Sequence, residues 1–183
     1  MSPTTKPVPR LTCLTAPLLK PLACVVVVVA ALAGVAAAAA DSGPSGLPLP
    51  RFVSLRADEV NLRAGPGTQY PVEWVYRRRL LPVEIVAEHH NWRRIRDWQG
   101  DQGWVHHSLL IGRRSVLITG EMAEVRATRE PGSRRVARVE PGVTGMLLTC
   151  PDPGPYCRVR FGRTEGWLAR SAFWGSYPGE IVR

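Results

Sequence analysis

The sequence lacks any arrangement of residues that would support nucleophilic or acid–base catalysis. None of its serines lies in a glycine-flanked elbow of the hydrolase kind. Asp58 and Glu59 are neighbours, so in an extended segment they point to opposite faces, which does not suit a two-carboxylate glycosidase. A cysteine nucleophile needs a free thiol, and Cys150 and Cys157 are placed to pair with each other. The sequence therefore predicts a protein that is not an enzyme.

Clusters of metal ligands are also lacking. The histidines form two adjacent pairs, His89–His90 and His106–His107. Adjacent residues of a strand point to opposite faces, so each pair offers at most one ligand to a site, whereas zinc needs three or four. No histidine stands at ligand spacing from the two late cysteines. We expect neither a metal nor another cofactor.

The first 40 residues have the features of an export signal. Lys6, Arg10 and Lys20 precede an uncharged apolar run, residues 22–40, which ends in five alanines before Asp41. This order favours a cleaved secretory signal peptide and a periplasmic protein. The run of 19 residues is close to the ~20 that span a bilayer, so a retained single-pass anchor in the inner membrane is the alternative.

Lysine is absent after residue 20. Of the 24 Lys and Arg residues, three lie in the first 40 positions, which leaves 21 arginines against 15 acidic residues, a net charge of +6. This excess indicates either a solvated basic surface or an attraction to anionic envelope polymers or lipid head groups. Because the chain is predicted to leave the cytoplasm, nucleic acid is not expected as a partner.

Only Cys150 and Cys157 remain after the leader, and the segment Pro-Asp-Pro-Gly-Pro-Tyr separates them. Such a turn-forming insert brings its flanks together as a hairpin. In an oxidising compartment the pair should form a disulfide, and a two-cysteine metal site is the rival interpretation.

The chain after the leader shows short strand patterns and no convincing amphipathic helix. Val60 and Leu62 alternate with polar neighbours, and Pro82 to Ala87 is rich in Val and Ile, with Glu84 expected to face away from the core. Several such runs in roughly 60 residues predict a small antiparallel barrel or sandwich. The expected strands are residues 52–56, 60–64, 72–76, 82–87, 92–96 and 104–105, then 123–127, 136–139, 143–148, 157–161 and 167–168.

The strand pattern occurs twice, 63 residues apart. Leu62-Arg63-Ala64 recurs as Val125-Arg126-Ala127, and Gly103-Trp104-Val105 recurs as Gly166-Trp167-Leu168. A repeat unit of this length is a small domain. The expected organisation is a signal peptide or anchor (1–40), a linker (41–51), a first domain (52–115) and a divergent, disulfide-bonded second domain (116–183). We expect the two barrels to pack closely.

Residues 60–72, Val-Asn-Leu-Arg-Ala-Gly-Pro-Gly-Thr-Gln-Tyr-Pro-Val, resemble the opening signature of bacterial SH3 domains. The Trp92–Arg96 and Gly103–Val105 segments follow in the family's order. The resemblance is strong over 52–112 and weaker over 116–174. The tandem form is similar to exported alphaproteobacterial proteins with paired domains. It implies two small SH3-like antiparallel β-barrels that target peptidoglycan or a protein partner.

The loop of the signature is present in the first copy only, because Thr128 to Ser133 replaces it in the second. Gly65 and Gly67 permit a tight reversal and Pro66 stiffens it. Tyr70, just beyond, either plugs the barrel end or forms the wall of a binding groove. The candidate loop residues are Gly65, Pro66 and Gly67.

The tryptophans divide into two groups. Trp104 and Trp167 begin matched strands and are expected in the core. Three others are absent from the second copy, and Trp98 among them lies in a turn, where it is either exposed near Tyr70 or a lid over the barrel. The candidate ligand-binding residues are Arg63, Tyr70, Trp74, Trp92 and Trp98.

The leading hypothesis is a non-enzymatic adaptor of the cell envelope, whose first domain binds peptidoglycan or an extended segment of a partner protein while the second braces it. A structural assembly partner of envelope proteins without wall binding is the alternative. A cell-wall hydrolase is a third hypothesis, which no catalytic residues favour.

Overall fold

The computed structural model describes residues 41–130 and 132–183, so the predicted signal peptide or anchor lies outside the described residues. Here the chain forms β-strands and two short 3-10 turns, η1 (His107–Leu109) and η2 (Arg170–Ala172), without an α-helix. In this part of the chain no helix has the length and hydrophobicity to span a bilayer. The prediction of an all-β fold is confirmed.

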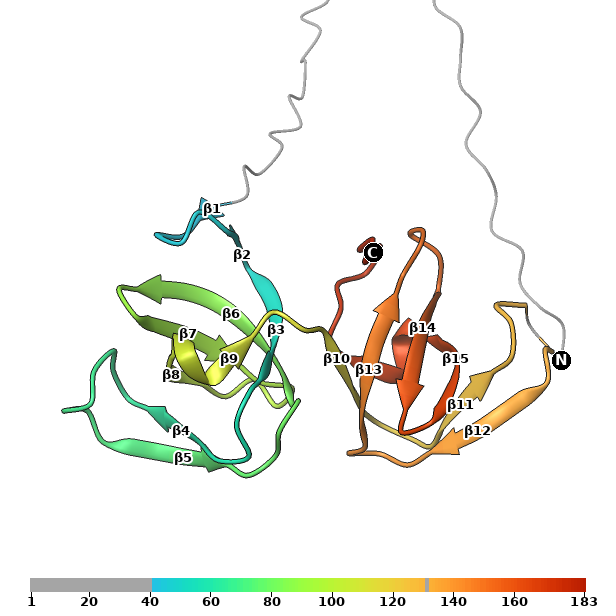
Figure 1. Ribbon diagram of the computed structural model, residues 1–183, viewed down its shortest axis with the longest axis horizontal. Helices are drawn as coiled ribbons and strands as arrows, with labels where there is room; N and C mark the ends of the chain where they lie inside the picture. Colours follow the sequence, from blue (N-terminus) through green and yellow to red (C-terminus); the bar gives the residue numbers. More distant parts are fainter. Residues whose placement is uncertain (1–40, 131) are drawn as a thin grey trace, which may run out of the picture. The chain divides into compact units, whose positions relative to one another are not determined.

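Two seven-stranded antiparallel sheets, each the wall of a small barrel, make up the fold (Figure 1). In the first sheet the spatial order is β5-β4-β8-β7-β6-β3-β9. A separate hairpin, β1 (Asp41–Ser42) with β2 (Pro48–Leu49), precedes it. The strands of the first sheet are β3 (Arg51–Leu55), β4 (Val60–Arg63), β5 (Val72–Tyr76), β6 (Pro82–His89), β7 (Trp92–Arg96), β8 (Gln102–His106) and β9 (Leu110–Ile111).

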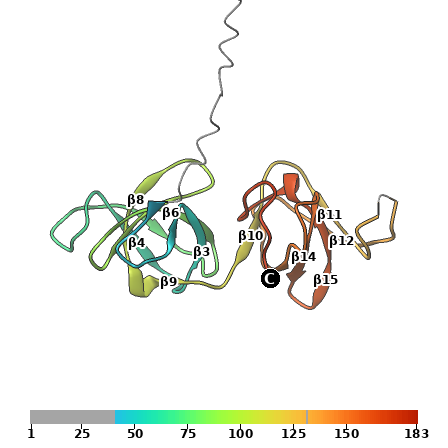
Figure 2. The same cartoon turned by 90° about the horizontal axis from the view of Figure 1, so that it is seen from above.

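The second sheet repeats the first in spatial order, β12-β11-β15-β14-β13-β10-β16. Each strand thus has a counterpart, from β5 and β12 at one edge to β9 and β16 at the other. Figure 2 shows β10 carrying the chain from the first sheet into the second. The strands are β10 (Ser115–Ile118), β11 (Ala123–Arg126), β12 (Arg135–Val139), β13 (Thr144–Thr149), β14 (Tyr156–Phe161), β15 (Thr164–Ala169) and β16 (Phe173–Trp174).

The core of each barrel consists of one face of each strand. In β4, Val60 and Leu62 are buried while Asn61 and Arg63 are partly exposed, which is the alternation of a half-buried strand. Burying each such aliphatic side chain stabilises the fold by about 1.5–3 kcal/mol. The fully buried aliphatic residues of the first barrel are Leu55, Val60, Val83, Ile95 and Val105, and those of the second include Val116, Val125 and Val159.

The glycine before each matched tryptophan has a packing reason. A Cβ atom at Gly103 would lie 2.6 Å from the Leu62 side chain, and one at Gly166 would lie 2.6 Å from Val125. Real side chains do not approach this closely, so only glycine lets β8 lie against β4 and β15 against β11. The repeated Gly-Trp motif therefore marks the same close approach in both barrels.

Glu84 is buried, although Val83 and Ile85 point into the core and Glu84, as expected, lies on the opposite face of β6. Its carboxylate accepts hydrogen bonds from Arg96 Nε at 2.7 Å and from the Tyr177 hydroxyl at 2.8 Å. These donors compensate for the desolvation of the charge. Burial and the adjacent Glu84 carboxylate together raise the pKa of Tyr177 well above its ordinary value, so this hydroxyl remains a donor.

Both sheets fall within one compact unit of the chain, and specific contacts join them. The hydroxyls of Ser54 and Ser115 are 2.5 Å apart, and both residues are buried. The ring of Phe52 contacts Trp174 edge-on, with centroids 5.0 Å apart, and Tyr177 at 4.7 Å. The expectation of closely packed barrels agrees with these contacts.

The segment 41–50, expected as a linker, is attached to the first barrel through Glu88. The Glu88 carboxylate accepts hydrogen bonds from the Ser45 amide at 2.9 Å and hydroxyl at 2.8 Å, and from Arg51 at 2.6 Å. Arg93 Nε lies 3.1 Å away, and the Glu88 side chain is inaccessible to solvent. Although burial of this carboxyl raises its pKa, the hydrogen bonds from Arg51 and Ser45 outweigh burial and lower the pKa of Glu88 to about 2.

We predict that the stabilisation contributed by the Glu88 carboxylate depends on pH. The folded-state pKa lies below the ordinary 4.5, so the contribution is complete above pH 4.5 and disappears as the pH falls toward 2. The free energy of unfolding should therefore differ between the wild type and Glu88→Gln most at neutral pH, with the difference shrinking through this window. Urea unfolding of both proteins across the range measures it, and a difference independent of pH would contradict the prediction.

The predicted disulfide is present. Cys150 and Cys157 are bonded, with their Cα atoms 4.4 Å apart, and both are fully buried in the core of the second barrel. Cys150 also exchanges two backbone hydrogen bonds with Val182, at 2.8 and 3.0 Å. The disulfide thus joins the end of β13 to the start of β14. It also fixes Cys150, to which Val182 near the end of the chain is hydrogen-bonded.

We predict that Cys150→Ser/Cys157→Ser lowers the free energy of unfolding of the second barrel by roughly 2.5 kcal/mol, the chain-entropy value for so short a loop. Hydrogen exchange of amides in β13–β15 should accelerate, while exchange in β6–β8 of the first barrel should change little. Equal protection in the oxidised wild type and the double variant would show that the bond contributes nothing.

Candidate functional site

Arg63 holds the loop 64–71 that follows β4. Its guanidinium donates hydrogen bonds to the carbonyl oxygens of Thr68 at 3.2 Å and Tyr70 at 2.7 Å. The Gly67 amide donates to the Gly65 carbonyl at 2.9 Å, which closes the tight reversal expected from the sequence. Arg63, a candidate ligand-binding residue, thus positions the loop with one guanidinium nitrogen, Nη1.

Tyr70 lies on the outside of the loop. Its ring packs on Gly65, where an added Cβ would come within 2.5 Å of the ring, and 40% of the residue is exposed. Neither core cluster of the described residues includes it. The Tyr70 ring is therefore not part of the barrel core.

We predict that Gly65→Ala displaces the Tyr70 ring without unfolding the barrel. The new methyl group needs the space that the ring occupies, and the ring is free to move because its outer side is exposed. The nuclear magnetic resonance signals of Tyr70 and Thr68 should shift while those of Ile95 stay in place. Unchanged Tyr70 signals would contradict the packing of this loop.

A patterned surface extends from Arg63 across the outward side of β8, β7 and β6. In the register of these strands Arg63 is opposite Trp104, and Trp104 is opposite Arg94. One row further, Trp92 is opposite both His106 and His89. Because Ile95 and Val105 point into the core, their neighbours in sequence point outward.

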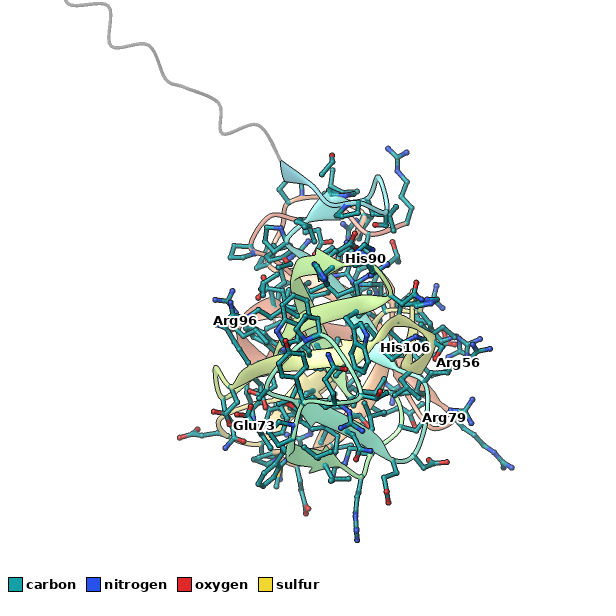
Figure 3. All side chains as sticks on the ribbon, turned by 90° about the vertical axis from the view of Figure 1, so that its left-hand side faces the viewer. Arg56, Glu73, Arg79, His90, Arg96 and His106 are labelled. Carbon is teal, nitrogen blue, oxygen red and sulfur yellow. A yellow bond between two sulfur atoms is a disulfide. The ribbon has the colours of Figure 1, made fainter. Side chains whose placement is uncertain are left out.

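The rings on this side contact one another. Trp92 meets His106 edge-on with centroids 5.4 Å apart, and His89 meets Trp104 edge-on at 6.4 Å. His106 Nδ1 also lies 2.8 Å from the Ser108 hydroxyl. Figure 3 views this barrel from outside, with His90 and His106 labelled. We call the surface the aromatic face, and its members are Arg63, His89, Trp92, Arg94, Trp104 and His106. Tyr70 lies in the loop that Arg63 holds, next to this face.

The expectation that Trp104 and Trp167 belong to the core is wrong. Both are half-buried and neither is a member of the buried clusters, whereas the next residues, Val105 and Leu168, are. Since successive strand residues alternate between faces, a core Val105 requires an outward Trp104. The outward position of Trp104, His89 and His106 could have been read from the alternation with Ile95 and Val105.

The other two candidate tryptophans lie apart from the aromatic face. Trp98, 37% exposed, lines a hollow together with Leu117, Ile118 and Gly142 of the second copy. Trp74, 60% exposed, stands on the edge strand β5 beside a hollow of about 220 Å³ that Leu62 and Gln102 also line. The structure thus places Arg63 and Trp92 on one surface, with Tyr70 in the loop that Arg63 holds, and places Trp74 and Trp98 elsewhere.

The turn between β7 and β8 is fixed by Asp97, which is buried. One of its carboxylate oxygens accepts the amides of Gln99 and Asp101, each at 3.0 Å, and the other accepts the Tyr76 hydroxyl at 3.0 Å. Burial, followed by the negative charge of Asp97, raises the pKa of Tyr76 far above its ordinary value, so Tyr76 stays a donor. This turn sets the register that aligns the rows of the aromatic face.

The corresponding side of the second barrel carries different residues. The register places Tyr156 at the position of Trp92 and Ala169 at that of His106. Trp167 matches Trp104, but the Arg129 guanidinium lies over its ring, 5.2 Å from the centroid. The described residues contain no group of three or more His, Cys, Asp or Glu side chains arranged to hold a metal ion.

Comparison with known proteins gives a family match for the first barrel. Residues 56–112 match the bacterial SH3 domain, which agrees with the resemblance seen in the sequence. That match does not include the second copy, and no curated protein matches the chain.

Among solved structures, NlpC2 and NlpC1 from Trichomonas vaginalis are similar, each with a TM-score of 0.32 and 11% sequence identity. The alignments cover 69% of this chain and 48% of NlpC2, and 75% of this chain and 49% of NlpC1. The chain spans about half the length of these structures.

Proposed function

We propose that this protein is a non-enzymatic binding protein of the cell envelope, whose first barrel recognises peptidoglycan or an extended segment of a partner protein through the aromatic face. The observation that carries this proposal is the pair of half-buried rings, Trp92 and Trp104, on adjacent strands beside the loop held by Arg63. The match of residues 56–112 to the bacterial SH3 domain supports a module of this kind.

The chemistry of the face suits sugar rings or a proline-rich chain. Indole rings that are partly buried are held in place, so they lose little conformational freedom when a ligand stacks on them. Arg94 is exposed between the two tryptophans and supplies a cation for a carboxylate or a carbonyl. Imidazoles at the ends of the row add polar edges for hydrogen bonds.

The second barrel serves as a brace in this proposal. Its matched tryptophan is covered by Arg129, which is held in turn by an ion pair with Asp152 at 2.5 Å. The contacts of Phe52 and Ser54 with the second copy fix the first barrel from the side of β3. Residence in the periplasm, with the leader cleaved or kept as an inner-membrane anchor, completes the proposal.

Co-sedimentation with purified sacculi tests the proposal. We predict that Trp92→Ala and Tyr70→Ala each weaken binding 5- to 150-fold, the equivalent of about 1–3 kcal/mol for a stacking aromatic. The matched controls Tyr156→Ala and Trp167→Ala change the second barrel and should leave binding within a factor of about two of the wild type. Thermal melting of each variant separates loss of the face from loss of the fold.

Several results would favour a different function for this protein. No sedimentation at low salt would reject a wall ligand, and crosslinking that recovers one dominant envelope protein through the same face would then favour the partner segment. If the Trp92→Ala and Tyr70→Ala variants crosslink to the same envelope protein as the wild type does, the result would favour a role in assembly that does not use the aromatic face. A lytic band on a wall-substrate zymogram would overturn the non-enzymatic assignment.

A further inference from the structure

Strand β5 is an open edge of the first sheet. It pairs with β4 on one side only, and in the described residues no strand pairs with its other side (Figure 1). Val72 and Trp74 on this edge are 42% and 60% exposed. An exposed edge that carries large apolar side chains is a template for pairing with another strand.

The counterpart strand β12 shows how this protein protects an edge. The registers with β4 and β11 make Arg135 the counterpart of Val72, Ala137 of Trp74 and Arg138 of Val75. These three apolar residues of β5 are therefore replaced by arginine or by the small alanine.

The arginines of β12 surround Glu124. Its carboxylate lies 2.7 Å from Arg135, 2.8 Å from Arg126 and 3.9 Å from Arg138. The hydrogen bond from Arg135 and the nearby charges hold the pKa of Glu124 below its usual value. Positive charge on an edge strand discourages pairing with another strand. The strand β12 carries this protection, and the matched positions of β5 do not.

We propose that β5 pairs antiparallel with β5 of a second copy of this chain, about a two-fold axis at Val75. In this register Trp74 is opposite Tyr76 of the second copy, and Glu73 is opposite Arg77 of the second copy. Because of the two-fold symmetry, each of these pairs occurs twice in the dimer. The interface is isologous, so it closes as a dimer and leaves no free edge of this kind.

Charge complementarity indicates that the strand pairing with β5 belongs to a second copy of this chain. Glu73 and Arg77 lie two residues on either side of Val75, carry opposite charges and are exposed. In the described residues Glu73 has no ion-pair partner, and Arg77 has only a 3.8 Å contact with Glu59 in which both side chains are largely exposed. Cross-strand pairs of opposite charge stabilise a sheet, and like charges opposite one another destabilise it.

The apolar side of β5 fits the same arrangement. Trp74 projects beyond the core beside Leu62 and Gln102, and the hollow there is open to solvent. A second β5 would cover Trp74 of each copy with the edge of the other barrel. In Figure 3 Glu73 is labelled apart from His106, which belongs to the aromatic face, although Arg63 of that face is opposite Val72 of β5.

Sedimentation velocity of the purified protein from about 1 µM to 1 mM, at low and moderate salt, tests the dimer. We predict a concentration-dependent monomer–dimer equilibrium. Glu73→Arg and Arg77→Glu should each raise the dissociation constant at least tenfold, because each places like charges opposite one another. The double variant Glu73→Arg/Arg77→Glu restores opposite charges and should recover dimerisation to within about threefold.

Two exposed charges away from β5 provide matched controls. Glu140→Arg and Arg163→Glu make the same changes in net charge and should leave the dissociation constant unaltered. A monomer at every concentration, a double variant as weak as the single ones, or equal effects of the controls would each overturn the proposal. The proposal is independent of wall binding, because Trp92→Ala should weaken binding to sacculi and leave the dimer intact.

Discussion

The close approach of β8 to β4 is the constraint on which the rest of the first barrel depends. Gly103 leaves no side chain between these strands, so Leu62 packs directly against its backbone. The next residue must then turn outward and the one after it inward, which places Trp104 outside and Val105 in the core. The same constraint acts at Gly166 in the second barrel. The outward position of Trp104 on the aromatic face therefore follows from the packing of Gly103 against Leu62.

Local patterns in the sequence predicted the strands β3 to β8 and β11 to β15, but not β1, β2, β9, β10 or β16. Two of them, residues 72–76 and 92–96, have the predicted bounds, and the turn-flanked cysteines formed the expected bond. Glu84 could not be predicted as buried, because its donor Tyr177 is 93 residues away in sequence. The separation of Trp98 from Tyr70 was equally hidden, because it depends on residues of the second copy that line the hollow around Trp98.

The two copies keep the same scaffold and differ in what they present. Strand order and the Gly-Trp motif are retained, whereas the outer row of Trp92 and His106 becomes Tyr156 and Ala169. The edge strand changes from apolar to arginine-rich, and only the second copy carries a disulfide. Surface positions are free to diverge because they contribute little to the core, so each copy can acquire a separate role.

The arginine content also has a structural explanation. Many arginines are engaged with carboxylates, and the Arg114 guanidinium holds Glu180 at 2.7 and 2.9 Å beside the Phe52 ring. The other arginines so engaged are Arg51 and Arg93 with Glu88, Arg77 with Glu59, Arg96 with Glu84, Arg126, Arg135 and Arg138 with Glu124, Arg129 with Asp152, and Arg158 and Arg160 with Glu165. A paired guanidinium attracts a distant polyanion less than a free one, and salt screens what remains. Recognition at the aromatic face would therefore rest on stacking and shape, with the net positive charge as a secondary contribution.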